Sequence, residues 1–150
     1  MTDMTSTDVD SPLTVRQYAL QSTVDGVVTE FLAMAFSTHI LLLISQTGKI
    51  GSMFITATDD SGSGGVTAHD LHRASLSGQV LLLGRQEGPQ GLVYDILVGE
   101  VSDTVKRAAT REQRPLLLGL ALKPVDPRAS DAFRTLTTTI LDGIEACRVW

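Results

Sequence analysis

The chain has 150 residues, of which 43% are hydrophobic and 19% charged, with a formal net charge of −5 and a pI of about 5.0. This length predicts one domain with a core large enough to fold without disulfides or a metal. The acidic balance argues against nucleic acid or an anionic membrane as the main partner, because both attract Lys and Arg. It is compatible with a protein partner that offers basic residues. The single cysteine, Cys147, excludes an intrachain disulfide and fits a reducing compartment.

Residues 1–14 are rich in Asp, Ser and Thr, which predicts a disordered N-terminal tail rather than a secretory signal or a transit peptide. The most apolar run, Phe31 to Ile44, is interrupted by Ser37, Thr38 and His39 and is shorter than the roughly 20 apolar residues of a membrane-spanning helix. We therefore expect residues 15–150 to form a single domain in the cytoplasm, with the nucleus left open as a second location.

The first half of the domain reads as four strands. Asp25-Gly26 lies between two β-prone runs, the second from Val27 to Phe36, which predicts a hairpin. The continuous apolar run Ile40–Ile44 is typical of a central strand that is covered on both faces. The strand that follows, "IGSMFITA", is expected to return beside it.

The stretch "SQTGKIGS", residues 45–52, has two interpretations. A phosphate-binding loop needs a Gly five positions before the Gly-Lys pair, a Ser or Thr directly after it, and a following helix. Here Leu43 and Ile50 occupy those positions, and a strand follows. The stretch is therefore interpreted as a hairpin turn, with Gly48 at a positive φ and Lys49 in solvent.

Residues 59–78 contain four glycines and show little periodicity, which predicts a long flexible loop. A functional loop and a plain connector are equally compatible with this composition. His69, Asp70 and His72 within it are an incomplete ligand set for a structural metal, which takes four ligands, so a solvated loop is the favoured interpretation.

The second half reads as a strand in "QVLLLG", a helix that begins near Pro89, a strand in "RPLLLGLAL" and a final helix that begins near Asp126-Pro127 or at Ser130. In the first helix we expect one buried stripe, made of Leu92, Val93, Ile96, Leu97, Val101 and Val105. In the last helix, one apolar face is made of Phe133, Leu136, Ile140, Ile144 and Cys147. This order predicts an α+β fold, with a mainly antiparallel sheet of about six strands and two helices late in the chain.

Candidate catalytic groups are few. Ser37 and His39 would share a face of an extended strand, but a nucleophile and its base also need an orienting group and an oxyanion site, and no G-x-S-x-G is present. Cys147 is interpreted as a small core residue. We therefore expect no enzyme activity, cofactor or metal, and favour a binding or assembly protein. The amount of apolar surface indicates a dimer, with a well-filled core as the alternative.

Two segments carry a family resemblance. "MAFSTHILLLISQTGKIGS", residues 34–52, and the ending "CRVW", residues 147–150, resemble the proteasome assembly chaperone 3 family, and the order of elements between them fits as well. The N-terminal tail and the glycine-rich stretch 61–65 depart from the family pattern. The resemblance implies a non-catalytic chaperone that pairs with proteasome assembly chaperone 4 or with itself. Such a pair helps the α subunits of the 20S core to form their ring, near α5, and leaves before the core is complete.

The partner contacts are a hypothesis. The acidic residues Asp59, Asp60 and Asp70 of the long loop would attract basic residues of α subunits, and Lys49 at its turn is a further candidate contact. The alternative function is a dimeric scaffolding or interaction domain of a trafficking or signalling complex, which would share the layout without a proteasome partner.

Overall fold

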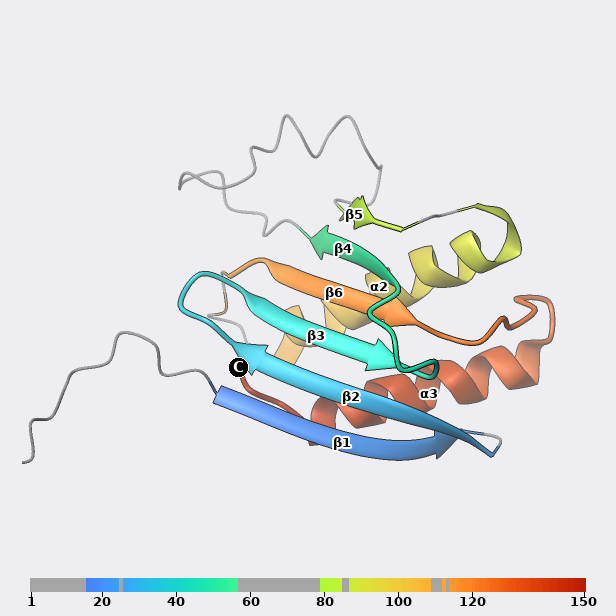
Figure 1. The fold of residues 1–150 in the computed structure, drawn as a ribbon, viewed down its shortest axis with the longest axis horizontal. Helices are drawn as coiled ribbons and strands as arrows, with labels where there is room; N and C mark the ends of the chain where they lie inside the picture. Colours follow the sequence, from blue (N-terminus) through green and yellow to red (C-terminus); the bar gives the residue numbers. More distant parts are fainter. Residues whose placement is uncertain (1–15, 25, 57–78, 85–86, 109–111, 113) are drawn as a thin grey trace, which may run out of the picture.

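In the computed structural model, the described residues are 16–24, for which the backbone alone is considered, 26–56, 79–84, 87–108, 112 and 114–150. One sheet contains six strands: β1 (Arg16–Val24), β2 (Val27–Ala35), β3 (Ile40–Ser45), β4 (Ser52–Thr56), β5 (Gln79–Leu83) and β6 (Leu116–Ala121). Two helices, α2 (Gly88–Ala108) and α3 (Ser130–Ala146), come late in the chain. The predicted α+β class is confirmed, and so is the predicted order of elements (Figure 1).

The strand order across the sheet is β1-β2-β3-β6-β4-β5. The β1–β2 hairpin predicted at Asp25-Gly26 is confirmed by the pairing of Val24 with Val27, and Gly26 has a φ of 77°. Every neighbouring pair is antiparallel except β3 and β6, which are parallel. The predicted β3–β4 hairpin is wrong, because β6 lies between these two strands. The segment between β3 and β4 instead crosses the end of β6, where the Gln46 amide donates to the Ala121 carbonyl at 2.8 Å.

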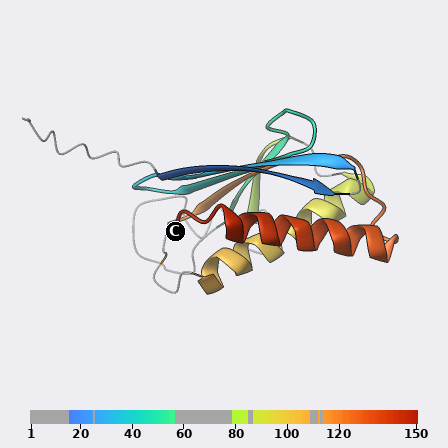
Figure 2. The ribbon, with the colours of Figure 1, turned by 90° about the horizontal axis from the view of Figure 1, so that it is seen from below.

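Both helices lie on one face of the sheet, as the turned view shows (Figure 2). Strand residues on that face are buried in rows that run across the strands, for example Ala33, Leu42, Leu118 and Phe54. The expectation that Ile40–Ile44 is covered on both faces is wrong for the described residues, although β3 does lie in the middle of the sheet. None of the described helices is long and apolar enough to cross a membrane.

Helix α3 packs against β1 and β2 through the predicted face, in which Leu136, Ile140 and Ile144 are buried. Its start at Ser130 is one of the two predicted starts. The ending "CRVW" returns to the core: Cys147 and Val149 are buried, and Trp150 packs beside them. Arg148 donates a hydrogen bond to the carbonyl of Ala108, the last residue of α2, where a cation also interacts favourably with the helix dipole.

Helix α2 packs against β6 and α3, but its buried face differs from the predicted one. Leu92 and Ile96 were expected in the core, and they are 53% and 39% exposed. The buried side chains of α2 are Val93, Tyr94, Leu97, Val98, Ser102 and the valines Val101 and Val105. Tyr94 explains the rotation, since its hydroxyl accepts a hydrogen bond from the Leu122 amide at 3.0 Å and its ring meets that of Phe54 edge-on.

A charged clamp fixes the turn between β2 and β3. Arg114 donates to both carboxylate oxygens of Glu112, at 2.7 and 2.6 Å, and to the carbonyl of Phe36 at 2.6 Å. The Phe36 amide in turn donates to the carbonyl of His39, and the Ile40 amide to that of Pro115. The clamp therefore holds the start of β6 against the start of β3, where the two strands begin their parallel pairing.

We predict that Gly143→Ala lowers stability. A Cβ at Gly143 would lie 2.5 Å from the ring of Phe31, so helix and sheet would have to separate. Overpacking of this kind costs about 1–3 kcal/mol, of which the better helix propensity of Ala returns at most about 1 kcal/mol. Denaturant unfolding should show a net loss of about 1–2 kcal/mol. An unchanged midpoint would contradict this close helix–sheet contact.

We predict that the Glu112–Arg114 clamp makes stability depend on pH. Hydrogen bonds from Arg114 lower the pKa of Glu112 below its ordinary value of 4.5. Because the folded pKa is depressed, the clamp stabilises the fold above that ordinary value, and this contribution is lost as the pH falls through the folded pKa. Glu112→Gln should lower the free energy of unfolding by about 1 kcal/mol at pH 7. This difference should disappear at a pH low enough to protonate Glu112 in both the folded and the unfolded protein. A difference from wild type that does not change between pH 7 and pH 3 would refute the prediction.

Candidate functional site

The face of the sheet opposite the helices is apolar except at one end, where Glu30 pairs with Ser45. The strand register aligns its apolar side chains in two rows across the strands. The first row is Leu32, Leu43, Gly119, Met53 and Leu83, and the second is Met34, Leu41, Leu117, Ile55 and Val80. Neither row contains a polar or charged side chain. We call these ten residues the open sheet face.

The described part of the chain places no helix over the open sheet face (Figure 2). Most of its side chains are half-buried by their neighbours within the sheet, while the matching residues of the helix-covered face are buried. Val28, on the same side of β2, is 50% exposed. Contiguous apolar surface of this kind on a soluble domain marks an interaction site more often than chance exposure does.

The segment between β3 and β4 forms a rim at one end of this face and projects from the sheet on the side away from the helices (Figure 2). Ile50, at its end, is 53% exposed and lies beside Gly119: a Cβ on Gly119 would be 3.5 Å from Ile50 Cγ2 and 2.6 Å from Leu43 Cδ2. Gly51 is also required, because its φ is 72° and a Cβ there would lie 2.1 Å from the carbonyl oxygen of Leu120. Ile50 and Gly51 thus hold the segment between β3 and β4 against β6.

Gln46 holds this rim in place. Its side chain donates to Thr29 Oγ1 at 3.0 Å and accepts from the Lys123 amide at 3.0 Å, so it joins β2 to the residues after β6. Ser45 Oγ accepts from the amides of Thr47 and Lys49, at 3.3 and 3.2 Å. The residues of "SQTGKIGS" therefore organise a tight crossover, and the element directly after it is strand β4 rather than the helix that a phosphate loop needs.

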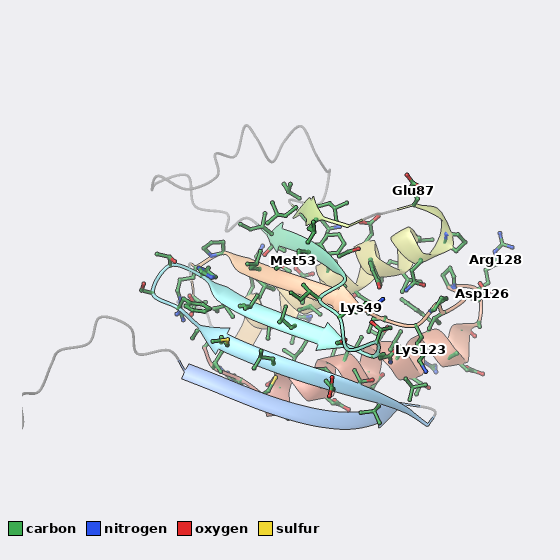
Figure 3. The ribbon with its side chains drawn as sticks, in the orientation of Figure 1. Lys49, Met53, Glu87, Lys123, Asp126 and Arg128 are labelled. Atoms are coloured by element: carbon green, nitrogen blue, oxygen red, sulfur yellow. The ribbon has the colours of Figure 1, made fainter. Side chains whose placement is uncertain are left out.

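Lys49 is exposed, as predicted, and lies on the rim near the C-terminal end of β6 (Figure 3). Gly48 has a φ of 68°, which also agrees with the prediction. The other predicted partner contacts, Asp59, Asp60 and Asp70, fall outside the described residues, as do His69 and His72. Of the four proposed contacts, the structure can place Lys49 alone.

The groups considered for catalysis have other surroundings. The ring of His39 stacks on Phe36 at 4.6 Å, and its Nδ1 lies 2.9 Å from Thr38 Oγ1. Cys147 is fully buried, as predicted, and burial raises the pKa of its thiol. The described residues contain no group of three or more His, Cys, Asp or Glu that could hold a metal ion. Binding through an apolar surface is the chemistry that this arrangement offers.

No family model matches the chain. Curated relatives do: human proteasome assembly chaperone 3 is 29% identical over 141 residues, covering 94% of this chain and 98% of the relative. Bovine proteasome assembly chaperone 3 is 32% identical over 125 residues, covering 83% and 86%. A chain in the crystal structure of a chaperone complex for yeast 20S proteasome assembly shares the fold, with a TM-score of 0.54 at 20% identity over 85% of this chain and 98% of that one.

The bovine relative exceeds 30% identity across most of its length. Of the segments that carried the resemblance, residues 34–52 form the end of β2, strand β3 and the rim, and residues 147–150 return to the core. On these grounds the chain belongs to the proteasome assembly chaperone 3 family.

Proposed function

We propose that this protein is a non-catalytic chaperone that promotes assembly of the α-ring of the 20S proteasome. It acts as a dimer, either with proteasome assembly chaperone 4 or with a second copy of itself. It engages α subunits near α5, and it leaves before the core is complete. The observation that carries the proposal is the open sheet face, considered together with membership of the family.

The open sheet face supports a dimer for a physical reason. Burying apolar surface releases about 25 cal/mol per Å², and two sheets stack face to face at about 10 Å with their side chains interdigitated. A second domain with a similar sheet would cover the two apolar rows, and Ile50 and Lys49 would border the contact. A partner of the same family fold provides such a sheet.

A chaperone of this kind needs no nucleotide. It shifts an assembly equilibrium by the difference between its affinities for correct and incorrect neighbours. Release requires that the contact with α subunits is modest and partly polar, as in transient interfaces. The acidic residues Asp59, Asp60 and Asp70 remain proposed contacts for basic groups of α subunits, and the cytoplasm, together with the nucleus, remains the proposed location.

We predict that Leu41→Asp abolishes dimerisation and leaves the fold intact. Leu41 lies in the middle of the open sheet face, between Met34 and Leu117. A buried unpaired carboxylate in a stacked interface is strongly unfavourable, whereas in the monomer this face borders water. The dimer dissociation constant, measured by analytical ultracentrifugation with the partner chaperone or with the chain alone, should rise at least about 100-fold.

Thr138→Asp is the matched control, because Thr138 is exposed on α3, on the other side of the sheet. It should leave the dimer unchanged. Circular dichroism of both variants should match wild type. A Leu41→Asp protein that still dimerises with wild-type affinity would place the dimer contact elsewhere.

We predict that co-expression with the α subunits and proteasome assembly chaperone 4 gives a complex that contains this chain and at least one α subunit. Size-exclusion chromatography followed by identification of the subunits checks this. A chain that dimerises but co-elutes with no α subunit would favour the alternative, a scaffolding domain of a trafficking or signalling complex.

A further inference from the structure

A second exposed surface lies on α2, on the side of the helix that faces away from the sheet. Leu92, Ile96, Gly99 and Asp103 follow one another at spacings of four, three and four residues, which places them on one stripe of the helix. Core residues such as Val93, Leu97 and Val101 occupy the opposite side. We call the stripe of these four residues the outer face of α2.

The described residues give the apolar side chains of this face no contact in the core. Leu92 is 53% exposed and Ile96 is 39% exposed, while the inner side of α2 is filled by other residues. Two large apolar side chains one turn apart are the usual anchors of a helix that docks against another helix.

Gly99 is the more informative residue. A glycine inside a helix costs about 1 kcal/mol relative to Ala, so a structural reason is expected. Gly143 in α3 has one, since a Cβ there would collide with Phe31. A Cβ on Gly99, in contrast, would meet nothing within 4 Å. Because Gly99 has no side chain, another molecule could approach the helix backbone closely next to Ile96.

The charge around the apolar part of this face is acidic. Glu87, Asp95 and Glu100 flank Leu92 and Ile96, and Asp103 ends the stripe. From residue 87 to residue 105 the sequence has no Lys or Arg, and the cations of α2, Lys106 and Arg107, lie in its last turn beside Asp103. Asp95 lies on the side toward β5, where Gln79 donates to its Oδ1 at 3.0 Å. Glu87 lies just before the helix and is exposed (Figure 3). An apolar stripe with an acidic border is complementary to an apolar stripe with a basic border.

We infer that the outer face of α2 is a second docking surface, which binds a helix that presents small or apolar residues flanked by Lys and Arg. Resting on the proposed function, we assign this helix to the α subunit that the chaperone holds. Figure 2 shows α2 on the side of the sheet opposite the open sheet face, and the outer face of α2 is the side of that helix away from its buried residues. One surface can therefore hold the partner chaperone while the other holds the α subunit.

Gly99→Leu tests the inference with the full chain, in its dimer, and purified α5 as the probe. The leucine would stand between α2 and its partner and should weaken α5 binding at least about tenfold. It should also raise the unfolding midpoint by about 2–4 °C, because helix propensity improves and a Cβ at Gly99 meets nothing within 4 Å. Thr138→Leu, which places a leucine on the exposed side of α3, is the control and should leave α5 binding unchanged.

A charge exchange tests the partner's chemistry. Glu100→Lys with Asp103→Lys should weaken α5 binding at least about tenfold and reduce its dependence on salt. The same exchange at Asp142 and Glu145, which are exposed on α3, should have little effect.

The outcomes separate the two proposals. The inference is supported if the wild-type protein binds α5 and both α2 variants bind it more weakly while their dimer affinity is unchanged. Binding that the α2 variants leave unchanged, or that the α3 controls weaken as strongly, overturns the inference and leaves the proposed function in place. Wild-type protein that binds no α subunit overturns the proposed function and the inference with it.

Discussion

The structure depends on a mismatch between one sheet and the layer that covers it. The strands are apolar on both faces, but α2 and α3 cover one face. In an antiparallel sheet with one wet face, apolar and polar residues alternate along each strand. Strand β3, with the sequence ILLLIS, does not alternate, and neither does β6, with LLLGLA. The inner residues of these strands form the core, and the outer residues form a second apolar layer over which the described part of the chain places no helix.

The position of β6 explains both the apolar middle of the sheet and the sequence motifs at the two ends of the β3–β6 pair. By lying between β3 and β4, β6 brings the two most apolar strands together in the middle of the sheet. The chain must then cross the end of β6 to reach β4, and the crossing requires Gly51 against the Leu120 carbonyl and Gln46 bound to Thr29 and Lys123. Arg114 and Glu112 fix the opposite end of the β3–β6 pair. Residues that resemble a phosphate loop are in fact the closure of a parallel strand pair.

The sequence predicted the strands and helices along the chain better than it predicted which strands pair in the sheet. Periodicity identified the strands and helices in order, and Asp25-Gly26 identified the local hairpin, because both signals come from residues close together in the chain. The β3–β4 hairpin was wrong because the true neighbour of β3 lies far along the chain, and nothing local in "SQTGKIGS" indicates an inserted strand. The apolar run Ile40–Ile44 correctly indicated a central strand. It could not reveal that the described helices cover only one face of this strand.

The error in α2 has a different origin. Counting Leu92 and Ile96 with Val93 and Leu97 gave an apolar stripe too wide for one packing face. The prediction also omitted Tyr94, whose hydroxyl accepts a hydrogen bond from the Leu122 amide and thereby turns the helix toward β6. A hydroxyl bond of this kind is a tertiary interaction that hydrophobic periodicity does not register. Of the candidate site, Lys49 could be predicted from local turn chemistry, whereas the open sheet face requires the register of distant strands.

The two exposed surfaces differ in the way that an assembly chaperone requires. The open sheet face has no charge in either row, so a dimer interface formed there would gain mainly from apolar burial and depend little on salt. The outer face of α2 combines two apolar anchors with an acidic border, so a complex formed there would gain from charge attraction, form quickly and dissociate readily. The proposed chaperone would have to keep its partner while it binds and releases its client. With the proposed dimer contact on the sheet and the proposed client contact on the helix, the second could break without loosening the first.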